Sequence, residues 1–258
     1  MNDPAAPLHA RRILVTRRPE QSSALVAGLR ERGATVLEVP LIEIAPPLDP
    51  RPLDAALSEL DGYAWVAFTS ANAVKAVVER RRAAGITSPL PRVASVGPAT
   101  RVALREHLPE AAVALEPASD FRAEGLLTAF AGLDVSGQRV LLPVSDKARD
   151  VLAEGLAARG ARVEVVVAYR TVAPAEAGPA LARALAEGVD IVTFASPSAV
   201  ENFVAIAPRA GVGVVAAVIG PVTEARARAL GLDVRVVAAP STAEGLVAAL
   251  SRAFTDRD

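Results

Sequence analysis

The sequence predicts an α/β protein made of two similar parallel-sheet domains. Two observations support this fold class: short β-branched runs alternate with Ala-, Leu-, Arg- and Glu-rich stretches of helical period, and the order of these segments repeats once along the 258 residues. Hydrophobic residues make up 52% of the chain and aromatic residues only 3%, so Ala, Val and Leu must build the cores. Strands that are apolar on both faces and alternate with helices imply parallel sheets covered on both sides.

The first strand–helix–strand unit begins with the run RILVT at 12–16. A helix is expected at 20–32, followed by Gly33 as its C-cap glycine, because glycine adopts the left-handed conformation at little cost. The next strand is expected at 35–39. The same cycle is predicted again as a strand at 139–142, a helix at 146–159, Gly160 and a strand at 162–167. Further strands are expected at 64–69, 92–96, 112–115, 190–194, 214–219 and 233–237.

Four sequence blocks recur in the same order along the chain. RRILVTRR…LRERGATVLEV matches GQRVLLPV…LAARGARVEVV, FTSANAV matches FASPSAV, VGPAT matches IGPVT, and AEGLLTAF matches AEGLVAAL. Chains of this composition resemble one another in general, but the shared FxSxxAV, GPxT and AEGL motifs favour a true internal duplication.

Two repeat-equivalent segments, PLIEIAPP at 40–47 and VAYRTVAP at 167–174, each follow a complete strand–helix–strand unit and end in proline. Proline stops continuation into regular structure, so these segments are expected to pair as a two-stranded linker between the domains. Paired domains of this kind commonly bind a ligand in the cleft between them, at the carboxyl ends of the parallel strands.

Charge and composition exclude several function classes. Lys and Arg total 28 against 29 for Asp and Glu, so a nucleic-acid partner is not expected. The chain has no cysteine and two histidines, His9 and His107, so neither a disulfide nor a metal centre is expected. Residues 1–11 are interpreted as a loose tail without the apolar region of a signal peptide, and no apolar stretch is long enough for a membrane span. We therefore expect a cytoplasmic protein, acting as a monomer.

Hydroxyl side chains follow several of the predicted strands, where helices begin. In the first copy these are Ser70 and Thr100, and in the second copy Ser196, Ser198 and Thr223. A helix N-terminus offers backbone N–H groups and a positive dipole end, which together suit a carboxylate or phosphate. For any one of these residues simple N-capping explains the hydroxyl equally well. A capping box is also expected at 241–244 (STAE).

Differences between the two copies point to function more directly than their agreement. Tyr169 aligns with Ile42, so its hydroxyl is not a requirement of the fold, although its ring could simply pack. Arg17 follows the first strand, where the second copy has Val144. Lys147 follows the equivalent strand. Ordinary surface charge is the alternative for both cations, and at an anion-binding cleft they would bind substrate.

The chain has neither a GxSxG elbow nor a phosphate-binding loop, but a series of its motifs resembles one family. These motifs are ILVTRRPE (13–20), VPLIEI (39–44), FTSANAV (68–74), SVGPAT (95–100), AYRT (168–171), FASPSAV (194–200), IGPVTEAR (219–226) and AEGL (243–246). In order and spacing they resemble the uroporphyrinogen-III synthase family, over nearly the whole chain.

The resemblance implies a lyase of tetrapyrrole and heme biosynthesis that needs no cofactor. Its substrate would be hydroxymethylbilane, a linear tetrapyrrole polycarboxylate, cyclised with inversion of the last ring. The resemblance also implies one domain of 12–39 plus 175–258 and another of 48–166. The sequence pattern alone leaves a simple sequential split open.

By the same resemblance, Tyr169 and Thr223 match the catalytic Tyr and Thr positions, and Ser70 and Ser196 match cleft serines. Asn72 stands where some relatives carry a basic residue, so this substrate contact departs from the family pattern. Because a phenol is a weak acid, Tyr169 would donate a hydrogen bond to the departing hydroxyl group. The rival interpretation is a cytosolic two-domain sensor that binds a polyanion without catalysis.

Overall fold

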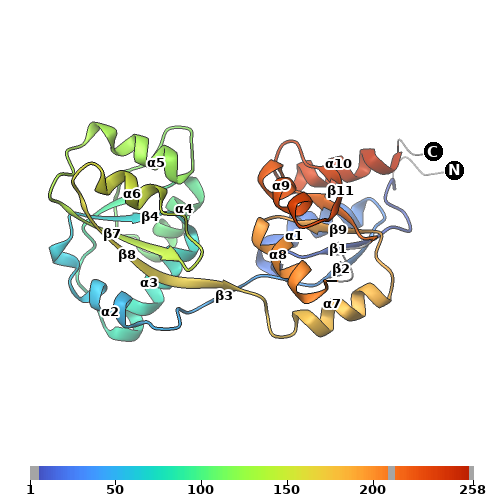
Figure 1. Cartoon of the computed structure of the whole chain (residues 1–258), viewed down its shortest axis with the longest axis horizontal. Helices are drawn as coiled ribbons and strands as arrows, with labels where there is room; N and C mark the ends of the chain where they lie inside the picture. Colours follow the sequence, from blue (N-terminus) through green and yellow to red (C-terminus); the bar gives the residue numbers. More distant parts are fainter. Residues whose placement is uncertain (1–5, 209–212, 256–258) are drawn as a thin grey trace. The chain divides into compact units, whose positions relative to one another are not determined.

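The chain folds into two compact units. The computed structural model describes all residues except 1–5, 209–212 and 256–258. Unit 1 combines Met1–Glu43 with Val172–Asp258, and unit 2 comprises Ile44–Thr171 (Figure 1). The backbone therefore passes from one unit to the other twice, after Glu43 and after Thr171.

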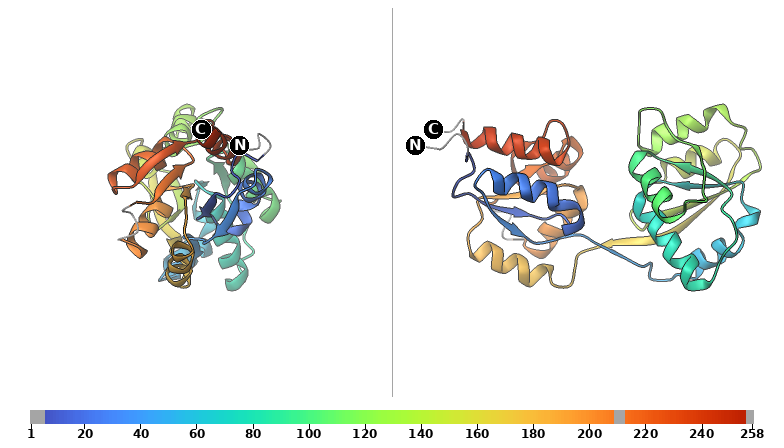
Figure 2. Two further views of the ribbon diagram at one scale, coloured as in Figure 1. Left: turned by 90° about the vertical axis from the view of Figure 1, so that its right-hand side faces the viewer. Right: turned by 180° about the vertical axis from the view of Figure 1, so that it is seen from behind.

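Unit 1 contains a five-stranded sheet in the order β11-β10-β9-β1-β2, and all its neighbouring strands run parallel. The strands are β1 (Arg12–Val15), β2 (Thr35–Glu38), β9 (Ile191–Phe194), β10 (Val215–Val218) and β11 (Asp233–Val237). The helices are α1 (Pro19–Glu31), α7 (Ala177–Ala186), α8 (Pro197–Ile206), α9 (Pro221–Ala229) and α10 (Ala243–Thr255). Helices α1 and α10 cover one face of the sheet, and α7, α8 and α9 cover the other (Figure 2).

Unit 2 contains a six-stranded sheet in the order β3-β8-β7-β4-β5-β6. Its strands are β3 (Glu43–Ala45), β4 (Trp65–Phe68), β5 (Arg92–Ser95), β6 (Val113–Leu115), β7 (Arg139–Ser145) and β8 (Arg162–Val172). Its helices are α2 (Arg51–Ser58), α3 (Ala71–Ala84), α4 (Pro98–His107), α5 (Ala123–Ala129) and α6 (Val151–Ala157), with single 3₁₀ turns at Leu60–Gly62 and Phe130–Gly132. Helices α2, α3 and α4 pack on one face, and α5 and α6 pack on the other.

The parallel, doubly covered sheets confirm the predicted α/β class. Strand β9 lies in the interior of the unit 1 sheet, and β4 lies in the interior of the unit 2 sheet. Every residue of these two strands is buried, as expected for strands with helices on both faces. The left-handed glycines are confirmed as well: φ is +87° at Gly33 after α1 and +83° at Gly160 after α6. At both helix ends the glycine N–H and the next N–H turn back onto helix carbonyls.

Three predicted boundaries are wrong. The strand expected at 139–142 continues to Ser145. The helix expected at 146–159 begins only at Val151, because residues 145–148 form a turn in which the N–H of Ala148 donates to the carbonyl of Ser145 at 3.1 Å. The strand expected to end at residue 167 continues to Val172. It does so because β8 pairs with β7 as far as Tyr169 and has β3 on its other side. The Arg170 guanidinium also donates to the carbonyl of Pro46 at 2.9 Å.

The segment expected to be a loose tail, 1–11, lies partly outside the described residues. Within the described part, Leu8 is fully buried in the core beneath α1 and α10. Its N–H donates to the carbonyl of Arg32 at 2.9 Å. Residues 6–11 are therefore part of packed unit 1, because an apolar side chain at position 8 fills the core beside the end of α1.

The capping box expected at 241–244 would make Ser241 the N-cap of helix α10, but α10 begins at Ala243 and its N-cap is one residue later, at Thr242. Its first turn is capped by Thr242, whose hydroxyl accepts the N–H of Gly245 at 3.0 Å. Ser241 therefore lies just outside the cap.

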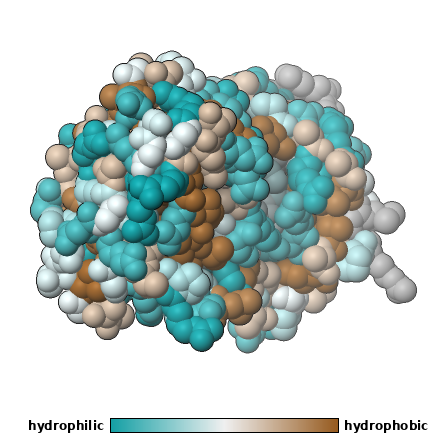
Figure 3. Space-filling model, turned by 60° about the vertical axis from the view of Figure 1, so that its left-hand side comes forward, coloured by the Kyte–Doolittle hydropathy of each residue, from teal (hydrophilic) through white to brown (hydrophobic). Residues whose placement is uncertain are grey.

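On the face that Figure 3 shows, the hydrophobic side chains form small patches bordered by hydrophilic ones. Among the residues that the structure describes, the exposed large hydrophobic ones are Leu48, Val102, Phe121, Val165, Val167 and Val222. Across the described ranges, no helix has the length and apolar character needed to cross a membrane.

The glycine of each AEGL motif is required by a close approach of the backbone. A Cβ atom at Gly125 would overlap the carbonyl oxygen of Asp120, and one at Gly245 would overlap the carbonyl oxygen of Pro240. The third residue of α5 and of α10 must therefore be glycine, because the backbone of the preceding loop occupies the space of a side chain there.

We expect Gly125→Ala to lower the free energy of unfolding by about 1–3 kcal/mol, because the added methyl group must displace the backbone at Asp120. Gly132→Ala is the matched control, since Gly132 is exposed and nothing lies within 4 Å of its added Cβ. Urea unfolding of both variants measures the difference. Equal stabilities for the two variants would show that the Asp120 loop moves freely.

Candidate functional site

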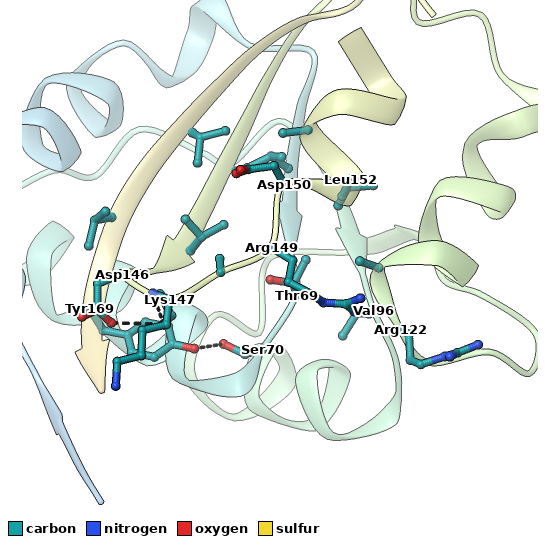
Figure 4. A pocket seen from close by; sticks show the side chains of 18 of the residues that line it. Thr69, Ser70, Val96, Arg122, Asp146, Lys147, Arg149, Asp150, Leu152 and Tyr169 are labelled. Atoms are coloured by element: carbon teal, nitrogen blue, oxygen red, sulfur yellow. Dashed lines mark hydrogen bonds between the residues drawn. The ribbon is translucent and has the colours of Figure 1, made fainter. Parts of the chain in front are cut away.

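A pocket of about 470 Å³ opens in unit 2 at the carboxyl ends of its strands. It lies beside the ends of β4, β5 and β7 and along the last part of β8 (Figure 4). The polar residues that line it are Thr69, Ser70, Arg122, Ser145, Asp146, Lys147, Arg149, Asp150 and Tyr169. Parallel strands bring residues that are far apart in the chain to this one edge, which is where α/β sheets commonly bind ligands.

Ser70 and Tyr169 meet inside the pocket. Their hydroxyl oxygens are 3.0 Å apart, and Figure 4 shows the two side chains pointing toward one another. Ser70 is also the N-cap of α3, because its hydroxyl accepts the N–H of Ala73 at 3.0 Å. A hydroxyl has a single proton, so Ser70 accepts from Ala73 and can still donate to Tyr169.

The ring of Tyr169 is held firmly. The residue is 8% exposed, and its ring is part of the core formed with α2, α3 and α4. The ring therefore packs in this core, while the hydroxyl end lines the pocket.

Three cationic side chains line the pocket, but two of them are paired. Arg122 donates to Asp120 at 2.7 Å, which raises the pKa of the Arg122 guanidinium, and Arg149 donates to Glu124 at 2.8 Å. Lys147 is exposed, and its ammonium group makes no ion pair within the part of the chain that the structure describes. Lys147 is therefore the cation that a bound anion meets without first displacing a carboxylate of the protein.

The remaining two predicted residues of unit 2 do not line this pocket. Asn72 is half-buried in the first turn of α3, and Thr100 is 3% exposed in the first turn of α4. The pocket thus brings together Ser70, Lys147 and Tyr169 out of the five.

The other predicted residues lie in unit 1, at the carboxyl ends of three neighbouring strands. Arg17 follows β1, Ser196 and Ser198 follow β9, and Thr223 lies after β10 in the first turn of α9. Ser196 caps α8 as Ser70 caps α3: its hydroxyl accepts the N–H of Ala199 at 3.3 Å. Thr223 is 3% exposed, so its side chain is buried.

Arg17 is half-buried, and its guanidinium makes no ion pair with any residue the structure describes. Burial, and then the neighbouring Arg18, lower the pKa of Arg17 from its ordinary value. A cation that is partly desolvated and has no carboxylate partner is stabilised when an anion binds beside it. Arg17 thus has the properties of an anion-binding residue.

The sequence reasoning missed Asp146 and the apolar wall of Phe121, Val165 and Val167. The sequence pattern predicts a helix at 146–159, in which Asp146 would be an ordinary surface residue. In the structure Val165 and Val167, at alternate positions of β8, are 46% and 39% exposed, but no pattern in the sequence distinguishes them from covered valines of a strand. No group of His, Cys, Asp or Glu in the described ranges is arranged to hold a metal ion.

The fold and the pocket define a two-unit α/β protein whose unit 2 has a pocket, lined in part by Lys147, at the carboxyl edge of its sheet. The family model for uroporphyrinogen-III synthase HemD matches residues 23–248. The chain belongs to the uroporphyrinogen-III synthase family.

Individual relatives agree with this assignment. The chain is 38% identical over 197 residues to a relative from Methanothermobacter thermautotrophicus, covering 75% of this chain and 76% of that one. It is 36% identical over 229 residues to the uroporphyrinogen-III synthase of Synechococcus elongatus, covering 84% and 85%. A solved structure of a mutant uroporphyrinogen III synthase from Thermus thermophilus is similar in fold, with a TM-score of 0.68 at 22% identity over 96% of this chain and 100% of that one.

Proposed function

We propose that this chain is a uroporphyrinogen-III synthase, a lyase that closes hydroxymethylbilane to uroporphyrinogen III and needs no cofactor. The observation that carries the proposal is the contact between the hydroxyls of Ser70 and Tyr169, 3.0 Å apart in a pocket that also holds the unpaired Lys147. A proton donor and a free cation side by side suit a substrate that has both a leaving hydroxyl group and carboxylates.

The reaction itself demands little acid–base power from the protein. The pyrrole nitrogen expels the hydroxyl group from the hydroxymethyl carbon, which leaves an azafulvene cation, and the leaving group takes up a proton and departs as water. The substituted carbon of the last ring then attacks the cation and forms a spiro intermediate. Opening and reclosure of this intermediate, with loss of a proton, inverts the last ring. Positioning of the substrate is the main catalytic device.

Tyr169 is the residue that assists the departure of the hydroxyl group. In the proposed arrangement the N–H of Ala73 donates to Ser70, Ser70 donates to Tyr169, and the Tyr169 proton is left to donate to the substrate. The 3.0 Å distances from Ser70 to both neighbours support this chain of donors. Each bond in such a chain polarises the next, which strengthens the final donor.

Substrate carboxylates are bound by cations and helix N-termini of both units. In unit 2 we assign this role to Lys147, to the backbone N–H groups of the α3 N-terminus beside Ser70 and Asn72, and to Thr100 at the start of α4. In unit 1 we assign it to Arg17, Ser196 and Ser198, with Thr223 as the second catalytic residue. The half-buried, unpaired guanidinium of Arg17 supports the assignment for unit 1.

The internal duplication, the exchanged domains, the two-stranded linker and the cleft remain part of this proposal. Matching local geometry supports the duplication. Ser70 and Ser196 cap their helices with φ of −161° and −160°, and Gly97 and Gly220 precede theirs with φ of 163° and 171°.

The proposal is tested by supplying the purified chain with freshly generated hydroxymethylbilane and resolving the product isomers. Uroporphyrinogen III should form faster than the uninverted isomer, which arises spontaneously. Binding of the bilane with only the spontaneous isomer as product would instead support a sensor without catalysis.

Tyr169→Phe should lower kcat by about 100-fold and raise the share of uninverted isomer, since a positioned proton donor contributes at least that much. Loss of the bond to Ser70 should cost about 1 kcal/mol of stability. Tyr63→Phe is the control: Tyr63 is the other tyrosine, and its hydroxyl bonds Glu164 at 2.6 Å away from the pocket. If rate and isomer ratio stayed unchanged in Tyr169→Phe, the residue would be a packing residue only.

Lys147→Gln should raise KM by about 3- to 10-fold with little change in kcat, because an exposed charge pair adds modest binding free energy. The increase should shrink as salt is added, since mobile ions screen such a contact. Lys75→Gln is the natural control, because Lys75 is the other lysine of the chain and is exposed on α3. An equal change in KM for both variants would mean that only net charge matters.

A further inference from the structure

We infer that Asp146 is a positioning residue for Tyr169, which it holds by the backbone on both sides. This inference rests on the proposed function, because it matters for the reaction only if Tyr169 takes part. Asp146 lies in the turn between β7 and α6 and lines the pocket.

Asp146 makes two hydrogen bonds to the strand that carries Tyr169. Its N–H donates to the carbonyl of Tyr169 at 3.1 Å, as Figure 4 marks, and its carboxylate oxygen Oδ1 accepts the N–H of Thr171 at 3.1 Å. The two contacts lie on either side of Arg170. Together they fix the direction in which the end of β8 runs, and with it the direction of the Tyr169 side chain.

The regular strand pairing fails where these contacts occur. Val144 pairs with Val167, but Ser145 pairs with Tyr169, so that Ala168 is an additional residue in β8. Such a bulge interrupts the ladder and re-aims the following side chain. The bonds of Asp146 replace the missing ladder at that position.

The carboxylate of Asp146 is itself held in place. The hydroxyl of Ser145 accepts the N–H of Lys147 at 3.0 Å and donates to Asp146 Oδ1 at 3.3 Å. The turn that presents Lys147 to the pocket and the strand that presents Tyr169 are thus joined through one carboxylate oxygen.

An acidic side chain is otherwise unfavourable at this site, because it repels the carboxylates of the proposed substrate. Asp150 lines the same pocket and is exposed like Asp146, yet its side chain accepts no hydrogen bond within the residues described. The two aspartates therefore separate the effect of charge from the effect of positioning.

The first test is kinetic, with product isomers resolved. Asp146→Ala should lower kcat about 10-fold, as a small misplacement of a reacting group does, and raise the share of uninverted isomer. Asp146→Asn keeps an oxygen that accepts the Thr171 N–H and should recover most of kcat. Asp150→Ala removes the same negative charge but no hydrogen bond to β8. It should therefore leave kcat unchanged and lower KM by up to about fivefold.

The second test does not depend on activity. The chain has two tyrosines, so ¹⁹F NMR of fluorotyrosine-labelled protein gives two signals, which Tyr169→Phe assigns. Asp146→Ala should shift or broaden the Tyr169 signal and leave the Tyr63 signal in place, whereas Asp150→Ala should move neither. If Asp146→Ala does not fold, Asp146→Glu serves instead: it keeps the charge, displaces the carboxylate, and should still move the Tyr169 signal.

The inference is overturned if Asp146→Ala and Asp150→Ala behave alike in both measurements, or if Asp146→Asn is as impaired as Asp146→Ala. Should the parent protein form no uroporphyrinogen III, the proposed function fails, while the NMR comparison still decides whether Asp146 positions Tyr169.

Discussion

The parallel pairing of β7 with β4 on one side and β8 on the other determines the geometry of the unit 2 site. Because the three strands run in the same direction, their carboxyl ends deliver Ser70, the turn after Ser145, and Tyr169 to one edge. The helices that follow then present their N-termini at that edge. A reversal of any of these strands would move its residue to the opposite edge, where Tyr63, Arg139 and Glu164 already form a separate cluster.

The two tyrosines show how differently one side chain is used at the two edges. At the amino edge, burial and then the bond to Glu164 raise the pKa of Tyr63, so its proton is committed to a carboxylate of the protein. At the carboxyl edge, the partner of Tyr169 is a neutral serine that can act as donor. The fold thus fixes one hydroxyl for stability and leaves the other able to serve a ligand.

Much of this arrangement was predictable from the sequence, because it depends on local signals. The β-branched runs marked nearly every strand, and Gly33 marked a helix end through its need for a left-handed conformation. The contact between Ser70 and Tyr169 joins residues 99 positions apart, and no local signal encodes it beyond the absence of a tyrosine in the other copy. The turn at Asp146 was missed because its helix-forming residues are overruled by hydrogen bonds to β8, a tertiary effect.

The discontinuity of unit 1 has a consequence for synthesis on the ribosome. Strands β1 and β2 emerge first, but β1 needs β9 as its second neighbour, and all of unit 2 is translated between them. Unit 2 is one continuous segment and can fold as soon as it has emerged. Until β9 has emerged, the nascent segment of β1 and β2 exposes an apolar strand edge, so of the parts of unit 1 it offers chaperones the longest opportunity to act.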